Sequence, residues 1–430
     1  LIPQTLALNA GLFFLPSCLL GMITPLASKQ VLTTLGTAGG VVGRLYAVST
    51  AGSILGVYLT GFVLVALLGS RHVVLLAGLI LLALALLLGH AHRARWWAAL
   101  ALIPTVGLLA YALQPHLRLG SCTVESQYYC VQVEQVEFPA GPVKFIRLDH
   151  LIHGLTVVGE PDVLVYSYTQ ILAEAAQYQA HDRPDFRALF LGGGGYSVPI
   201  HLERKYPQAS IEVVEIDPAV TRIAQTELGL DPTSRIVTYN EDARMAVREL
   251  PAGQYDLIVS DVFNDMAVPY HLTTREFNAH LQRLLNPEGI YLVNLIVKVS
   301  KGRFLRSFVH TLQTLYPHVY VLSEAGNYQA AALVGGRALP VADRTTVIVA
   351  AARQPIDFSR FRSYRTGTEA PTASVVASSD SAQPLAPGSR VLLTDDYAPV
   401  DTMVAELFTD DVKQWDWQLL VPPAWRRWLL

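Results

Sequence analysis

The most constraining feature of this sequence is that its first 124 residues contain no aspartate or glutamate. The first carboxylate of the chain is Glu125, and only six basic residues precede it: Lys29, Arg44, Arg71, Arg93, Arg95 and Arg118. An ionised group inside a bilayer costs several kcal/mol, so membrane insertion selects against charge. The N-terminal region is therefore predicted to lie in a membrane.

Four apolar segments follow one another in this region, at residues 5–27, 45–68, 73–89 and 96–113. A helix that crosses a bilayer needs about 20 predominantly apolar residues. We therefore predict a transmembrane helical region over residues 1–115, with about four spans. The lipid bilayer is then a partner of the chain. The sequence begins with leucine rather than methionine, which leaves further upstream spans open.

The side of the membrane that the soluble part faces stays open. With four spans, four of the six basic residues lie opposite the soluble part and two lie on its side, so the positive-inside rule favours an extracytoplasmic soluble part. Cys122 and Cys130 lie eight residues apart, which would suit a disulfide in an oxidising compartment. Two reduced, buried thiols are the alternative.

The remainder of the chain is acidic, with 26 of the 32 basic residues against all 35 acidic ones. It has no run of lysine or arginine, so a nucleic-acid partner is not predicted. It has neither an H-E-x-x-H nor a C-x-x-C motif, so no metal is predicted. Alternating apolar residues around a Pro/Gly turn at 139–142 predict a small β-domain over residues 121–160. Residues 367–389 are rich in Pro, Ala and Ser and predict a mobile loop.

Strands and helices alternate in the central part of the chain. A short apolar strand at 187–191 runs into four glycines, and a helix at 197–205 and a second strand at 211–217 follow. Further strands are expected at 235–239, 255–260 and 289–295. This alternation indicates a parallel sheet covered by helices on both faces. We therefore predict an α/β class I methyltransferase-like (Rossmann-like) domain over residues 161–430.

The glycines and an acid predict a nucleoside site. Gly192, Gly193 and Gly194 at a strand-to-helix turn allow a ligand to approach the backbone closely. Glu215 follows Gly192 by 23 residues at the end of the second strand, where a carboxylate can accept both ribose hydroxyl protons. The run lacks G-x-G-x-x-G, which favours an adenosyl ligand over a dinucleotide. Asp242, followed by Ala243, is interpreted either as a contact to an adenine amino group or as a helix N-cap, and both roles are compatible.

Residues 125–295 resemble the spermidine synthases, or polyamine aminopropyltransferases. The motifs GRLYA at 43–47 and LTDDYAPV at 393–400 make the whole chain similar to bacterial fused membrane-transporter/spermidine-synthase-like proteins. The resemblance implies decarboxylated S-adenosylmethionine, or S-adenosylmethionine itself, as co-substrate and a small amine as acceptor. It implies that Gly192, Gly193 and Gly194 form the glycine loop and that Glu215 binds the ribose. It implies that Asp242 and Ala243 contact the adenine. It implies that Asp261 and Tyr168 are catalytic residues, with Asp261 deprotonating the amine.

The sequence departs from the family pattern at the residues that match the family's amine-binding site. The family's second aspartate, which grips the polyamine, is replaced by Asn264, and Asp265 is displaced by one residue. His271 in the same loop is interpreted as a loop residue or as a new acid/base group. The matches of Asp149 and of the pair Gln127 and Tyr129 to the family's N-terminal hairpin are loose.

Three hypotheses follow from the sequence. The first is a membrane-anchored aminopropyltransferase, which would need its soluble domain in the cytoplasm, where adenosyl substrates are made. The second is an S-adenosylmethionine-dependent methyltransferase-like enzyme. The third is a non-catalytic structural subunit that retains the fold. A homo-oligomer or a subunit of a membrane complex is compatible with each of them.

Overall fold

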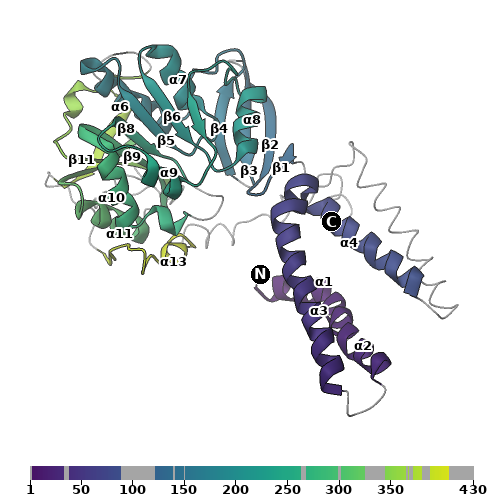
Figure 1. Cartoon of the computed structure of the whole chain (residues 1–430). Coiled ribbons are helices and arrows are strands. Elements are labelled where there is room, and N and C mark those ends of the chain that lie inside the picture. Colours follow the sequence, from purple (N-terminus) through teal and green to yellow (C-terminus); the bar gives the residue numbers. More distant parts are fainter. Residues whose placement is uncertain are drawn as a thin grey trace. The chain divides into compact units, whose positions relative to one another are not determined.

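The computed structural model describes residues 2–32, 38–88, 122–138, 141–149, 151–262, 268–298, 302–324, 344–364, 367, 371–379 and 388–405. The chain divides into two compact units. The first comprises Leu1–Gly120 with Glu125–Gln127, and the second comprises Ser121–Val124 with Tyr128–Leu430. Figure 1 shows helices in the first unit and two sheets with their covering helices in the second.

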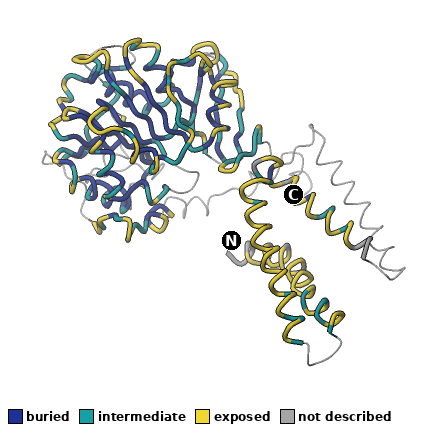
Figure 2. Tube along the Cα trace, viewed as in Figure 1, coloured by how far each residue is buried: buried dark blue, intermediate teal, exposed yellow. Residues whose placement is uncertain are grey.

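The first unit is helical. Its elements are α1 (Ile2–Gly21), α2 (Ile23–Val31), α3 (Ala38–Leu59), the π-helical turn η2 (Thr60–Leu64) and α4 (Val65–Leu88). Large apolar side chains of α3 stand exposed, among them Leu55 and Val57. Figure 2 accordingly shows this helix as mostly exposed. A helix with apolar residues on its outer surface requires another apolar phase or partner to cover it.

One helix in the described part of the chain, Ala38–Leu64, is long and apolar enough to cross a membrane. It corresponds to the span predicted at 45–68. A shorter apolar helix, His72–Leu84, lies within the span predicted at 73–89. The segment predicted at 5–27 is divided between α1 and α2, and the one at 96–113 lies outside the described residues. A single helix of this kind is weak evidence, so the four-span prediction is not confirmed.

A four-stranded antiparallel sheet in the order β1-β2-β3-β4 precedes the larger sheet in the sequence. Its strands are β1 (Val124–Glu125), β2 (Cys130–Phe138), β3 (Gly141–Leu148) and β4 (Leu151–Val157). Strands β2 and β3 form the predicted hairpin, with Phe138 opposite Gly141. One face of this sheet packs on helix α8 (Pro218–Glu227) through a small cluster that includes Val131, Ile146 and Val220.

The larger sheet has eight strands in the order β12-β10-β11-β9-β8-β5-β6-β7. They are β5 (Arg187–Leu191), β6 (Ser210–Val214), β7 (Val237–Tyr239), β8 (Tyr255–Ser260), β9 (Leu285–Lys298), β10 (His318–Glu324), β11 (Arg344–Ala352) and β12 (Ala373–Ser378). The five strands from β9 to β7 are parallel, as predicted, and β11, β10 and β12 add an antiparallel edge. The Rossmann-like core expected from the sequence is therefore present.

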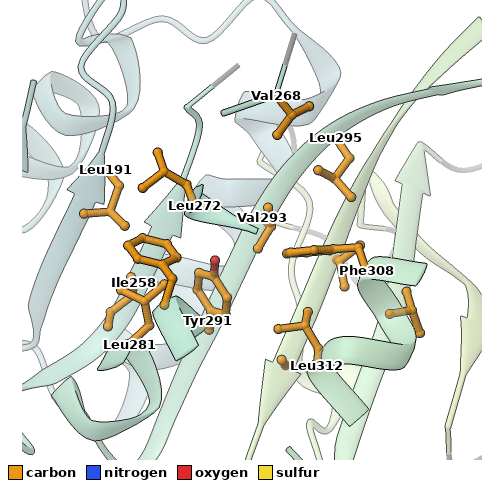
Figure 3. Close-up of a cluster of buried hydrophobic side chains, with 14 of the residues drawn as sticks. Leu191, Ile258, Val268, Leu272, Leu281, Tyr291, Val293, Leu295, Phe308 and Leu312 are labelled. Atoms are coloured by element: carbon orange, nitrogen blue, oxygen red, sulfur yellow. The ribbon is translucent and has the colours of Figure 1, made fainter. Parts of the chain in front are cut away.

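Two hydrophobic clusters cover the two faces of this sheet. Along β5, Leu189 and Leu191 point into one cluster while Ala188 and Phe190 point into the other, as the twofold alternation of a strand requires. Figure 3 shows the first cluster, in which Tyr291 and Val293 of β9 lie beside Phe308 and Leu312. Helices α9 (Ala243–Glu249), α10 (Arg275–Leu284) and α11 (Arg303–Gln313) cover that face, and α6 (Ser167–Asp182) and α7 (Ser197–Lys205) cover the other.

One segment corrects the sequence prediction. Residues 367–389 were expected to form a mobile loop, but Ala373–Ser378 form strand β12, which pairs antiparallel with β10. The expectation followed from Pro, Ala and Ser content. Within the segment, however, two adjacent valines and an open edge of β10 favour strand pairing, because β-branched residues pack well on a pleated surface.

Candidate active site

A cavity of about 570 Å³ opens at the carboxyl ends of the parallel strands, where open α/β sheets bind ligands. Residues of the small sheet, among them Ile152 and His153, form its opposite wall. Seven of the eight residues singled out from the sequence line it: Tyr168, Gly192, Gly194, Glu215, Asp242, Ala243 and Asp261. Gly193 lines a smaller adjoining pocket of about 40 Å³ together with Tyr168 and Asp261. Residues far apart in the sequence thus meet in one place.

The glycine loop is packed too closely for side chains. Gly192 has a φ of 89°, and a Cβ there would lie 2.3 Å from the carbonyl oxygen of Asp261. A Cβ on Gly195 would lie 3.1 Å from the Cα of Gly154 in β4. The loop therefore contacts the backbone of Asp261 on one side and of the small sheet on the other.

Glu215 at the end of β6 binds this loop. Its Oε2 accepts hydrogen bonds from Gly193 N over 2.8 Å and from Gly194 N over 3.4 Å, and its Oε1 accepts from Asp217 N over 2.9 Å. Burial raises the pKa of Glu215, while the three backbone N–H groups act in the opposite direction. A carboxylate has about four lone-pair sites; Oε2 uses both of its own for the two glycine N–H groups, so Oε1 retains one site that can accept from a ribose hydroxyl.

Asp242 is the N-cap of α9 and uses one oxygen for that purpose. Oδ1 accepts from Arg244 N over 2.7 Å and from Met245 N over 3.3 Å. Oδ2 faces Nε2 of His271 at 3.6 Å. The helix cap is therefore confirmed, and the second oxygen remains on the cavity wall for a ligand.

Asp261 lies directly after β8 and is half-buried, and two side chains hold its carboxyl group. Nδ2 of Asn294, on the neighbouring strand β9, donates to Oδ1 over 2.8 Å, and the Tyr168 hydroxyl forms a second hydrogen bond. Burial raises the pKa of Asp261, and Asn294, the charge of His153 and Tyr168 oppose that rise. Burial and the neighbouring Asp261 hold the pKa of Tyr168 well above its usual value, so the phenol stays protonated and donates.

Asn294 and His153 are site residues that the sequence analysis missed. Asn294 interrupts the apolar run Tyr291–Val297 of β9, and an amide in a buried strand is a signal that could have identified it. Its Oδ1 is buried and has no hydrogen-bond partner among the described residues. A buried acceptor of this kind on a cavity wall is suited to a ligand N–H group.

Of the three loosely matched residues of the hairpin, one lines the described cavity wall and two do not. Tyr129 lines the cavity, and burial, followed by the negative charges of Glu215, Asp217 and Asp149, raises its pKa. Asp149 instead accepts from Cys130 N over 2.9 Å, and neither Asp149 nor Gln127 is among the described lining residues. Asn264 and Asp265 lie outside the described residues.

The charge of the cavity wall is one-sided. Among the described residues that line it are four carboxylates, two histidines and five tyrosines, and none is lysine or arginine. The carboxylates belong to Glu215, Asp242, Asp261 and Asp401. A cleft of this composition attracts cations, through its negative field and through the faces of the aromatic rings. No group of three or more His, Cys, Asp or Glu side chains that could hold a metal ion occurs in the described part of the chain.

Sequence comparisons identify proteins that are similar to this chain. No protein-family model matches the chain. It is 37% identical over 110 residues to a polyamine aminopropyltransferase of Vibrio vulnificus, a match that covers 25% of this chain and 37% of that protein. It is 28% identical over 275 residues to polyamine aminopropyltransferase 2 of Streptomyces coelicolor, covering 58% of this chain and 48% of that protein.

Two further similarities extend the comparison. The human eEF1A lysine and N-terminal methyltransferase is 26% identical over 144 residues, covering 31% of this chain and 20% of that protein. A probable spermidine synthase structure from Corynebacterium glutamicum has 21% identity and a TM-score of 0.49, covering 61% of this chain and 95% of that one. The chain spans less than half the length of the aminopropyltransferases named above. The sequence matches show that part of the chain is similar to the polyamine aminopropyltransferases, the spermidine synthase family.

Proposed function

We propose that this protein transfers an aminopropyl group from decarboxylated S-adenosylmethionine to a small amine. The observation that carries the proposal is the half-buried Asp261, held by Asn294 and Tyr168 in the same acidic cavity as Glu215 and Asp242. The nucleoside residues and the candidate base thus line one continuous space. In the proposed assignment, Glu215 binds ribose, Asp242 binds adenine, and Asp261 faces the attacking amine.

The reaction needs a base because the acceptor is an ammonium ion at neutral pH. Asp261 would take a proton from that ammonium, which frees the nitrogen lone pair. The nitrogen then attacks the methylene carbon beside the sulfonium. A C–N bond forms, the C–S bond breaks, and its electron pair stays on sulfur in methylthioadenosine. The raised pKa of Asp261 brings the carboxylate nearer to the basicity that proton transfer at neutral pH requires.

The acidic wall favours the decarboxylated co-substrate over S-adenosylmethionine. Both ligands carry a sulfonium, but only S-adenosylmethionine adds a carboxylate. None of the described lining residues is a lysine or arginine that could pair with that carboxylate. Like charges in a partly desolvated site repel strongly, so the decarboxylated ligand fits better.

A methyltransferase-like activity is the second candidate. It is supported by the sequence similarity to the human enzyme named for methylating eEF1A lysine and N-termini, which also acts on amines. The same base would serve, since methyl transfer to an amine also requires loss of an ammonium proton. The two candidates differ in the co-substrate, and this difference makes them separable.

We further propose that helix Ala38–Leu64 anchors the chain in a bilayer. Its length, its apolar composition and its exposed side chains support an anchor. The soluble unit of an active enzyme would then lie on the cytoplasmic side of a bacterial-type inner membrane.

The test is turnover by the full chain in detergent or nanodiscs with each co-substrate and a set of diamines and monoamines. Formation of methylthioadenosine from decarboxylated S-adenosylmethionine, dependent on the added amine, is the expected result. S-adenosylhomocysteine formed from S-adenosylmethionine would favour the methyltransferase instead. Absence of both products with every amine would overturn the proposal and leave the non-catalytic subunit.

A further inference from the structure

His271 stands against the carboxylate of Asp242 on the cavity wall. It belongs to the short helix η4 (Tyr270–Leu272), in the loop where the sequence departs from its family. Its Nε2 lies 3.6 Å from Asp242 Oδ2, and both residues line the cavity that holds Glu215. An imidazole and a carboxylate oxygen therefore face the ligand space side by side.

Arg244 fixes the backbone of His271 by a hydrogen bond. This guanidinium donates to the carbonyl oxygen of His271 and also to Oγ1 of Thr274 over 3.2 Å. Its other terminal nitrogen pairs with Asp395. Because Arg244 lies in the first turn of α9, next to the Asp242 cap, it fixes η4 to the same helix end. The backbone of His271 and the Asp242 cap are thus held at one helix end.

The two groups differ in hydrogen-bonding character. Asp242 Oδ1 is committed to the cap of α9, so Oδ2 is left as an acceptor. An imidazole N–H of His271 is a donor. The edge of adenine presents the complementary pair, an amino donor beside a ring-nitrogen acceptor, and proteins read this pair with one acceptor and one donor on adjacent atoms.

We infer that His271 is a specificity-determining residue that reads the adenine base together with Asp242. The inference rests on the proposed function, because it requires an adenosyl ligand in this cavity. Asp242 Oδ2 accepts from the exocyclic amino group, and His271 donates to a neighbouring ring nitrogen. A hypoxanthine base in the same position would place a carbonyl oxygen opposite Oδ2. Two acceptors would then face each other without a proton, which is unfavourable where the bound base excludes water from them.

The inference is tested by calorimetric titration of the full chain with 5′-methylthioadenosine and its deaza analogues. His271→Phe keeps a ring beside Tyr270 but removes both imidazole nitrogens. We expect it to weaken binding about fivefold, the worth of one hydrogen bond. The matched control is His181→Ala, because His181 also lies beside an aspartate, Asp182 at 4.0 Å, but stands exposed on α6. The control should bind as the unmutated chain does.

The analogues identify the contact itself. With the unmutated chain, either 1-deaza- or 7-deaza-methylthioadenosine should bind about fivefold more weakly, because it lacks the ring nitrogen that His271 contacts. With His271→Phe, the same analogue should bind as well as methylthioadenosine does, since the contact is already lost. Full affinity of His271→Phe, or an analogue penalty that survives in this variant, would overturn the inference alone. An unmutated chain that binds no methylthioadenosine would overturn the proposed function and this inference with it.

Discussion

The backbone N–H of Gly193 donates to Glu215 Oε2 over 2.8 Å, which ties the glycine loop to the end of the neighbouring strand. The acid expected to bind ribose therefore also shapes the loop that borders the ligand. Glu215 is 5% exposed, so its charge is compensated mainly by these backbone groups. Substitution at this position should affect ligand binding both directly and through the loop.

We expect Glu215→Gln to weaken methylthioadenosine binding by at least roughly tenfold, because a hydrogen bond to a charged group contributes about 1.5–3 kcal/mol. The measurement is isothermal calorimetry, with near-ultraviolet circular dichroism to show that the domain is folded. Glu227→Gln is the control, because Glu227 pairs with Lys144 at the surface. Equal affinity of Glu215→Gln and the unmutated chain would remove Glu215 from the site.

Asp261→Asn should separate binding from chemistry. The amide retains the shape of the carboxyl group but cannot accept a proton from the ammonium, so turnover should fall by about a hundredfold or more. Methylthioadenosine affinity should stay within a few-fold of that of the unmutated chain. Asp182→Asn on the surface is the control. Loss of folding or of nucleoside binding in Asp261→Asn would show a structural role instead.

The pH dependence of kcat/KM should report the environment of Asp261. The base must be ionised, and burial raises its pKa, so activity should rise through a pH range above that of an ordinary aspartate. Asn294 opposes that rise by donating to the carboxylate. Asn294→Ala should therefore move the acid limb of the profile to still higher pH. A limb that stays in place would contradict the role given to this hydrogen bond.

The free energy of unfolding should also depend on pH, because Asp261 and Glu215 have raised pKa values in the folded state. The pKa values of Asp261 and Glu215 are higher in the folded state than in the unfolded state. At a pH between a group's unfolded and folded pKa values, the native state therefore binds more protons than the unfolded state. The free energy of unfolding should fall as pH rises from the unfolded pKa through the folded pKa. Asp261→Asn should reduce this slope, as measured by denaturant unfolding at several pH values. A slope that Asp261→Asn does not reduce would show that Asp261 does not titrate as stated.

The sequence pattern predicted the site residues that lie at strand ends, but not those that reach the site from a strand interior or through side-chain contacts. The ends of parallel strands meet at one edge of the sheet, so Glu215, Asp242 and Asp261 could be placed together without coordinates. Asn294 comes from the interior of a strand, and its contact with Asp261 depends on the parallel register of β8 and β9. His271 reaches Asp242 through the anchorage of η4 by Arg244, a side-chain contact that no local pattern encodes. Strand β12 depends in the same way on an available edge, β10.

Cys122 and Cys130 are joined by a disulfide, with their Cα atoms 5.1 Å apart. Cys130 also donates its backbone N–H to Asp149, and the residue before it, Tyr129, lines the cavity. The sequence left a disulfide and two reduced thiols as alternatives, and the structure has the disulfide. Disulfides persist in oxidising compartments. Adenosyl substrates are made in the cytoplasm, so the compartment of this cysteine pair separates an enzyme from a non-catalytic subunit.

We expect Cys122 and Cys130 to stay unlabelled by a membrane-impermeant maleimide in intact cells, with or without a membrane-impermeant reductant, and to become labelled when the membrane is opened and their disulfide is reduced. This result follows from the proposed enzyme, whose soluble unit must reach cytoplasmic substrate. The labelling is done in a Cys18→Ser background, because Cys18 is the free and exposed cysteine of the chain. A Cys122→Ser, Cys130→Ser double variant in the same background measures non-specific signal. Samples are treated with and without prior reduction. Labelling of intact cells only after reduction would show a disulfide outside the cytoplasm, and it would overturn the aminopropyltransferase proposal in favour of a subunit that keeps the fold without its substrate.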